Sequence, residues 1–230
     1  MNTLILIIRN KIDKNHIDIV KYFESIEKYF DKSLVFIVNC AQEDLSFIKS
    51  QNIRVVETTY LDSDSNIFAI IIQILNSISK LDNKYVIISD VNNVFFERNS
   101  FSYLEHFKND LYLCNFGSIQ AEPIHTKNRF SNFIKTCSYF LGNENSGLSI
   151  GGQFFGGTYD AIKSLSLILF LETNRNSAQI IDIQSILSYI YSYLETLYKV
   201  KFLDQTFFSV KSNFLQFSNS PKKPYIYLKK

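Results

Sequence analysis

The stretch YVIISDVNNVFFERNSF, residues 85–101, begins with an apolar run, continues through a polar group and becomes apolar again at Val94–Phe96. A short, continuous apolar run bounded by turn-forming residues is typical of a strand that is buried on both faces of a sheet. We therefore expect a central strand at Tyr85–Ser89 that leaves the sheet at Asp90.

Upstream of this strand, segments of strand and helix character alternate. The expected strands are Leu4–Ile8, Leu34–Val38 and Ile53–Thr59. The expected helices are a helix with apolar residues at Ile17, Val20, Phe23, Ile26 and Phe30, a short one at Asp44–Ser50, and one that begins at Ser63 or Ser65 and ends near Lys80. This alternation predicts an α/β fold whose central sheet is mostly parallel and flanked by helices.

The second half of the chain is less regular. We expect strands at Leu111–Phe116, Leu148–Phe155 and Val200–Leu203, and helices at Asn128–Phe140, Tyr159–Leu171 and Gln179–Leu194. The chain ends in a basic tail, PKKPYIYLKK. Because there is no internal repeat and no Pro/Gly/Ser-rich linker, residues 1–230 are interpreted as a single domain.

Composition excludes several classes of protein. A hydrophobic content of 46% indicates a globular chain, and a net charge of +2 without a basic stripe argues against nucleic-acid binding. Three separated cysteines without a CxxC pair indicate reduced thiols and a cytoplasmic location. No apolar run reaches the roughly 20 residues of a membrane helix, so we expect at most peripheral membrane association.

Polar residues at the carboxyl ends of the expected strands are candidates for ligand contacts, because α/β sheets bind ligands at that edge. These candidates are Arg9, Asn10, Ser65, Asp90, Asn92 and Asn93. Asp and Asn also favour turns, because their side chains bond to nearby backbone groups. Both interpretations of residues 90–93 stay open at this point.

The segment NENSGLSIGGQFFGGTYDAI, residues 143–162, holds most of the chain's seven glycines. Glycine allows close approach of the main chain to a ligand, so the two Gly-Gly pairs predict a narrow wall around a flat, polar substrate. The residues of this predicted wall are Gly151, Gly152, Gln153, Phe154, Gly156 and Gly157. The alternative is a bulged strand or a corner that requires glycine. The spacing matches neither a dinucleotide fingerprint nor a P-loop.

Two blocks resemble the GT-A glycosyltransferases. DVNNVFF resembles the DVDMVF segment of the histo-blood-group and α-1,3-galactosyltransferase family, and GGQFFGGT resembles that family's GGFFGGS segment. The tail KKPY is more loosely similar to the KPW ending of glycogenin-like transferases. The order of the elements between the blocks agrees as well.

The resemblance implies a single-domain GT-A enzyme with a nucleotide-binding half at 1–100 and an acceptor-binding half at 101–230. Such an enzyme moves a hexose from a nucleotide-sugar donor to a glycan, lipid-linked or protein acceptor, here in surface glycan biosynthesis. It also implies retention of configuration at the anomeric carbon. The alternatives are a non-catalytic nucleotide-sugar- or glycan-binding protein descended from such an enzyme, and a purely structural interaction protein.

The chain departs from the family pattern at the Asp-x-Asp motif, where Asn92 replaces the second carboxylate. An amide in place of a carboxylate weakens a Mn²⁺ or Mg²⁺ site. Either Asp90 binds a metal weakly together with donor phosphates, or cations such as Arg9 and Lys223 and helix N-termini hold the diphosphate without a metal. The tail lysines also fit a solvated terminus.

Roles for individual residues follow as hypotheses from the resemblance. Asp90 and Asn92 contact ribose or sugar hydroxyls, and Gln153 contacts donor or acceptor. The family's later acidic block is missing, and the nearest feature is IIDIQSIL with Asp182 and Gln184. Asp182 is a base, an acceptor for a sugar hydroxyl, or a carboxylate favoured by the N-terminus of a helix.

Overall fold

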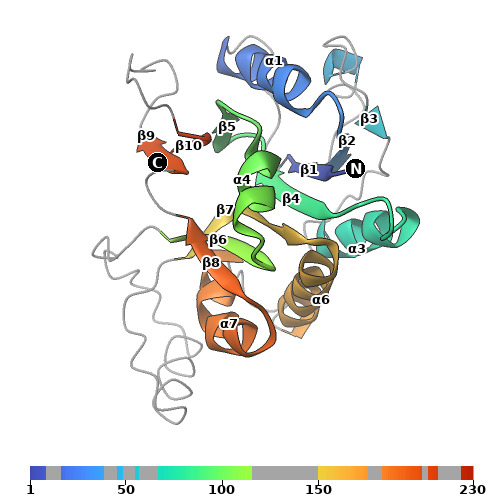
Figure 1. Ribbon diagram of the computed structural model, residues 1–230, viewed down its shortest axis with the longest axis vertical. Coiled ribbons are helices and arrows are strands. Elements are labelled where there is room, and N and C mark those ends of the chain that lie inside the picture. Colours follow the sequence, from blue (N-terminus) through green and yellow to red (C-terminus); the bar gives the residue numbers. More distant parts are fainter. Residues whose placement is uncertain are drawn as a thin grey trace.

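A computed structural model describes residues 1–8, 17–38, 46–48, 55–56, 67–115, 150–175, 183–203, 207–211 and 224–229. Its centre is a seven-stranded sheet of order β3-β2-β1-β4-β7-β6-β8 (Figure 1). The strands are β1 (Thr3–Ile7), β2 (Leu34–Val38), β3 (Val55–Val56), β4 (Tyr85–Asp90), β6 (Leu111–Asn115), β7 (Ile150–Thr158) and β8 (Val200–Leu203).

The pairing of the strands confirms a mostly parallel sheet. β1 pairs in parallel with β2 and β4, β2 with β3, and β6 with β8. Only β7 is reversed, since it runs antiparallel to both β4 and β6. The carboxyl ends of β4, β6 and β8 therefore share one edge of the sheet with the amino-terminal end of β7.

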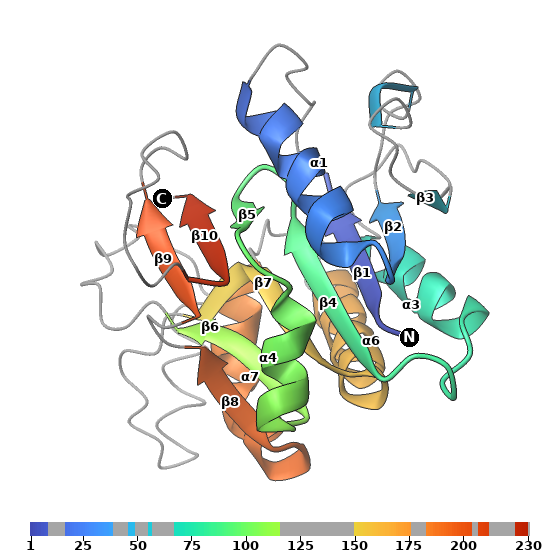
Figure 2. The same ribbon diagram turned by 45° about the horizontal axis from the view of Figure 1, so that its top comes forward.

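Helices cover both faces of this sheet (Figure 2). The helices are α1 (Ile17–Phe30), α3 (Ile67–Ser77), α4 (Ser100–Phe107), α6 (Tyr159–Arg175) and α7 (Ile183–Leu197). Strand side chains alternate between the faces: Leu4 and Leu6 of β1 pack with α1, whereas Ile5 and Ile7 pack with α3, α6 and α7. This alternation is why the parallel strands read as unbroken apolar runs in the sequence.

A second, three-stranded sheet was not expected from the sequence. It has the order β5-β10-β9, with β5 at Val94–Phe96, β9 at Phe208–Lys211 and β10 at Ile226–Lys229. β10 is antiparallel to β5 and parallel to β9. Ile226 and Leu228 of the tail are fully buried, whereas Lys222 and Lys223 lie outside the described residues, so the solvated-terminus alternative for these lysines is not tested.

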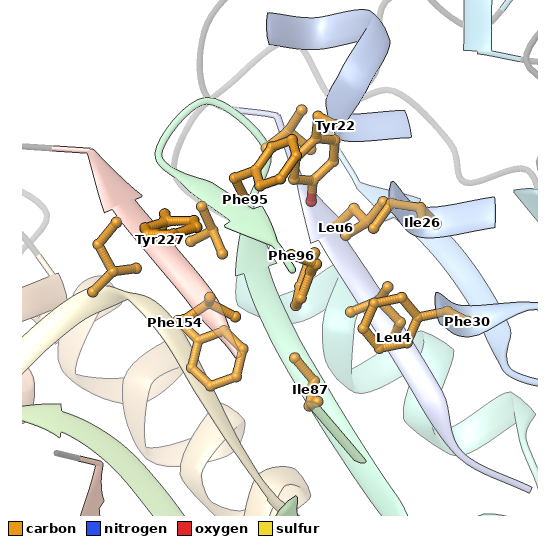
Figure 3. Close-up of a cluster of buried hydrophobic side chains, with 14 of the residues drawn as sticks. Leu4, Leu6, Tyr22, Ile26, Phe30, Ile87, Phe95, Phe96, Phe154 and Tyr227 are labelled. Atoms are coloured by element: carbon orange, nitrogen blue, oxygen red, sulfur yellow. The ribbon is translucent and has the colours of Figure 1, made fainter. Parts of the chain in front are cut away.

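Aromatic rings fill the layer between α1, the second sheet and the main sheet (Figure 3). The ring of Phe96 lies 4.8 Å from that of Phe30 and 6.3 Å from that of Phe154, both edge-on. Edge-on pairs of this kind add to the stabilisation from burial. Because Phe96 belongs to β5, this packing fixes the chain directly after the polar residues that end β4.

Most of the expected elements are confirmed, with shifted ends. The helix α4 was not expected; it is capped by the side chain of Asn99 and stops at Lys108, which has a left-handed backbone with φ of 53°. The helix expected at 128–140 lies outside the described residues. Within the described part of the chain, no helix combines the length and apolar character needed to cross a bilayer.

Candidate functional site

The sheet brings together the two segments that the sequence singles out. Ser89 of β4 lies opposite Phe154 of β7. Since β7 is antiparallel to β4, Gly151–Gln153 lie beside the point where β4 runs into Asp90–Asn93. Both segments therefore occupy the carboxyl edge of the sheet, where α/β folds bind ligands.

The carboxylate of Asp90 organises a tight turn at this edge. Its Oδ1 accepts a hydrogen bond from the backbone N–H of Asn92 at 2.9 Å, and its Oδ2 accepts one from Nδ2 of Asn93 at 3.0 Å. The backbone N–H of Val91 donates to the carbonyl of Ile7 at 2.9 Å and ties the turn to β1. Asp90 is 1% exposed. The turn interpretation of these residues is thus confirmed, and a ligand contact is compatible with it.

Two buried amide atoms at this edge have no hydrogen-bond partner among the described residues. One is Nδ2 of Asn92, a donor, and the other is Oε1 of Gln153, an acceptor. Buried polar atoms in folded proteins nearly always have a partner, so such exceptions need an explanation. One atom needs an acceptor and the other a donor, and hydroxyl groups can serve as either.

A bulge in β7 accounts for the position of Gln153. The pairing between β6 and β7 runs from Leu113 opposite Phe155 directly to Cys114 opposite Gly151. The register therefore shifts between Leu113 and Cys114, where β7 runs through Gly152, Gln153 and Phe154. Bulges turn side chains out of the regular alternation of a strand. The bulged-strand interpretation of the glycine segment is thus confirmed for its first Gly-Gly pair.

The second Gly-Gly pair lies inside the sheet. Gly156 and Gly157 are paired with Ile87 and Val86 of β4. A Cβ on Gly157 would lie 2.2 Å from the carbonyl oxygen of Asp110, which is far inside contact distance. Close approach of the backbone explains Gly157, and neither glycine borders the turn at Asp90. Of the four glycines in the expected wall, Gly151 and Gly152 lie at the ligand edge, together with Gln153.

The other residues of the predicted site are placed as follows. Phe154 is fully buried and packs between Phe96 and Phe207 in the aromatic layer. Gln184 lies in the first turn of α7. Because α7 leads into β8, whose carboxyl end is on the ligand edge, α7 begins at that edge. Outside the described residues lie Arg9, Asn10, Ser65, Asp182 and Lys223.

The described residues alone do not supply a divalent-cation site. Asp90 contributes a single carboxylate, and both of its oxygens already accept hydrogen bonds within the turn. No cluster of three His, Cys, Asp or Glu side chains occurs in the part of the chain that the structure describes. Mn²⁺ and Mg²⁺ require several oxygen ligands, of which carboxylates are the strongest.

Sequence reasoning missed two residues beside the turn, Tyr22 and Ser89, which are 2% and 0% exposed. Helical spacing marks position 22 only as a buried helix position, and a serine at the end of an apolar strand carries no motif. The one available signal was a polar residue within a segment expected to be buried on both faces.

Comparisons with known proteins concern the fold. No protein-family model matches the sequence, and no curated protein matches it. The galactosyltransferase LgtC, solved with donor and acceptor sugar analogs, matches with a TM-score of 0.54 at 10% identity, over 100% of this chain and 87% of that one.

Two further solved structures match to a similar degree. Mouse xyloside xylosyltransferase 1 gives a TM-score of 0.55 at 10% identity, over 98% of this chain and 96% of that one. A glycosyltransferase involved in glycosylation of the major capsid of PBCV-1 gives 0.54 at 10% identity, over 99% and 92%. The chain therefore has the fold of these glycosyltransferases, which confirms the GT-A architecture expected from the sequence.

Proposed function

We propose that this chain is a glycosyltransferase that moves a sugar from a nucleotide-sugar donor to a hydroxyl group of an acceptor. One observation carries the proposal: at the ligand edge of the sheet, a buried amide donor, Nδ2 of Asn92, and a buried amide acceptor, Oε1 of Gln153, lack partners among the described residues. Sugar hydroxyls donate and accept hydrogen bonds, so they are suitable partners for atoms of both kinds. The finer assignment is a hexosyltransferase that acts in surface glycan biosynthesis.

The chemistry assigns these residues to binding and orientation. Transfer breaks the anomeric C–O bond to the nucleoside diphosphate, so the enzyme has to hold the donor and align the acceptor hydroxyl. Asp90 holds the turn that presents Asn92, and the bulge in β7 presents Gln153. Gly151 and Gly152 lack side chains, so the main chain of β7 carries no bulky group beside this edge.

Donor binding is proposed to depend weakly or not at all on a divalent cation. A metal, where one binds, would be held by Asp90 together with donor phosphates and would neutralise charge on the leaving group. The single carboxylate and its two hydrogen bonds in the turn argue against a strong site.

Calorimetric titration with a panel of nucleotide sugars, with and without Mn²⁺, tests the function. We expect one donor to bind at micromolar to millimolar concentration, with Mn²⁺ raising the affinity less than about tenfold, or about 1.4 kcal/mol. Transfer to simple glycoside acceptors is then followed by release of the nucleotide. Absence of binding by every donor at millimolar concentration would contradict the proposal.

Gln153→Leu tests the acceptor atom of the proposed site. Its Oε1 has no partner in the part of the chain that the structure describes, so we expect the thermal midpoint to stay constant or rise. Loss of the bond to the sugar hydroxyl is expected to lower kcat/KM by about 10- to 100-fold, or about 1.4–2.7 kcal/mol. Thr158→Val, at the opposite end of β7, is the control and should leave kcat/KM unchanged. Equal activity of Gln153→Leu and the wild type would remove Gln153 from the site.

A non-catalytic donor- or glycan-binding protein is the second candidate. It is favoured by Asn92 in place of a carboxylate and by the use of both Asp90 oxygens within the turn. The same titrations discriminate the two candidates. A donor that binds but is neither hydrolysed nor transferred, with a broad panel of acceptors, indicates the binding protein.

A further inference from the structure

The second sheet brings a lysine close to the candidate site. Leu228 of β10 lies opposite Val94 of β5, and Val94 directly follows Asn93 in the turn at Asp90. Because β10 is antiparallel to β5, the chain continues from Leu228 to Lys229 at the end of the sheet where that turn lies. Lys229 therefore occupies the position of β10 that is nearest to the turn.

The neighbouring strand ends in the same way. β9 is parallel to β10, and their register pairs Lys211 with Lys229. In Figure 2, the arrowheads of β9 and β10 point the same way as that of β4. The backbones of the two lysines thus lie on adjacent strands, about 4.8 Å apart in the hydrogen-bonding direction. This end of the second sheet borders the ligand edge of the main sheet.

The strand that carries Lys229 is anchored on both sides. Ile226, Tyr227 and Leu228 are 0%, 2% and 0% exposed. The backbone N–H of Ile226 donates to the carbonyl of Phe207 at 3.0 Å, and β10 pairs with β5 on one side and with β9 on the other. Packing therefore fixes the backbone up to the residue before Lys229.

Protection of a sheet edge accounts for only one of these lysines. β9 is an outer strand in the order β5-β10-β9, and lysine in an outer strand discourages pairing with another chain. β10 lies between two strands, so Lys229 does not serve that purpose. Like charges at paired positions of neighbouring strands also repel each other and destabilise a sheet. An anion bound by both lysines would remove that repulsion.

We propose that Lys211 and Lys229 form an anion site for the diphosphate of the ligand that binds at the Asp90 turn. The inference rests on the proposed function, which makes that diphosphate part of a nucleotide sugar. Lysine carries a compact positive charge and is a common ligand of phosphate groups. Two lysines on adjacent strands supply two such charges for two linked phosphates. Their charge also stabilises the departing nucleoside diphosphate, for which the described residues offer no strong cation site.

Calorimetric titration with pyrophosphate in metal-free buffer tests the site in the wild type, Lys211→Gln and Lys229→Gln. This probe has the linked phosphates without the sugar or the base. We expect each substitution to weaken pyrophosphate binding about 5- to 20-fold. The dependence of the affinity on salt concentration should weaken as well, since one charge fewer is screened. Lys229→Arg keeps the charge and should stay within about threefold of the wild type.

Lys199→Gln is the matched control. Lys199 is exposed and directly precedes β8, whose amino-terminal end lies at the opposite edge of the main sheet. The substitution removes the same charge from the chain but leaves the proposed site intact, so the affinity for pyrophosphate should not change.

The thermal midpoint separates binding from folding. Without ligand, the midpoints of Lys211→Gln and Lys229→Gln should equal or exceed that of the wild type, because the repulsion between the paired lysines is removed. Pyrophosphate at a fixed concentration should raise the midpoint of the wild type more than that of either variant. A large fall in the midpoint of both unliganded variants would show a structural role and overturn the proposal.

The outcomes also separate this inference from the proposed function. If pyrophosphate binding depends on both lysines but no nucleotide sugar binds, the proposed function fails and the anion site remains. If nucleotide sugars bind the wild type and both glutamine variants with equal affinity, the proposed function stands and the lysines have no such role. Inorganic phosphate is the second probe. Affinity equal to that of pyrophosphate, or an equal loss in Lys199→Gln, would show general attraction of anions to a basic surface and overturn the proposal.

Discussion

Gly157→Ala is expected to lower the free energy of unfolding by about 3–4 kcal/mol. The added Cβ would lie 2.2 Å from the carbonyl oxygen of Asp110 and 3.2 Å from the Cα of Leu111. These are backbone atoms, and the Asp110 carbonyl accepts a hydrogen bond from the N–H of Thr158 at 2.8 Å. Relief of the clash would therefore separate β7 from the start of β6. Urea unfolding followed by circular dichroism measures the loss, with a fall in thermal midpoint of roughly 6–15 °C.

Gly156→Ala is the matched control on the same strand. Its Cβ would meet Cγ1 of Ile87 at 3.1 Å and Cδ2 of Leu104 at 3.2 Å, and these side-chain atoms need to shift by only a few tenths of an ångström. We expect a loss of about 1 kcal/mol or less. Equal losses for the two variants would show that the close approach at Asp110 is not what requires glycine at position 157.

The main sheet was predictable because its strands are buried on both faces. A strand such as β1 has apolar residues at every position from Leu4 to Ile7, and these side chains enter two separate apolar layers in alternation. The helices between these strands keep a single apolar face. Both patterns are local, so each element could be assigned from its own segment of sequence.

The second sheet was not predictable for the opposite reason. β5 has only three residues, Val94–Phe96, and it becomes a strand by pairing with Ile226–Lys229 near the far end of the chain. The segment YIYL is short and apolar and stands in a basic tail, and nothing in it or beside it indicates that it forms a strand. Pairing between segments distant in sequence is decided by tertiary packing, here by the rings around Phe96.

The candidate site likewise has one part that could be predicted from the sequence and one part that could not. The polar exit of β4 could be assigned to the ligand edge because parallel strands end together. The two Gly-Gly pairs look alike in sequence, yet one lies in a bulge at that edge and the other packs against Asp110 inside the sheet. Glycine meets both requirements by lacking a side chain, so the sequence alone does not separate them.

Asp90→Ala is expected to lower kcat/KM at least about 100-fold and to weaken donor binding, while the sheet stays folded. The substitution removes the acceptors for the Asn92 amide and for Nδ2 of Asn93, so the turn no longer presents Asn92 to the ligand. We expect a loss of stability of about 1.5–3 kcal/mol, as is typical of hydrogen bonds to a charged group. Steady-state kinetics and calorimetry measure these effects, with circular dichroism to verify the fold. Unchanged binding and turnover would remove Asp90 from the site.

An exchange of the two polar side chains separates the charge of Asp90 from its role in the turn. Asp90→Asn keeps an acceptor for the Asn92 amide but presents an amide donor to Nδ2 of Asn93. In the double variant with Asn93→Asp, the amide at position 90 donates to the carboxylate at position 93. The hydrogen bond between the two side chains is thereby restored with its direction reversed, and the negative charge moves by three residues. If the turn is what matters, the double variant should recover donor affinity to within about fivefold of the wild type, whereas Asp90→Asn alone should not. If the carboxylate itself contacts the donor or a cation, both variants should be as impaired as Asp90→Ala, and a loss of any Mn²⁺ effect in both would identify the cation.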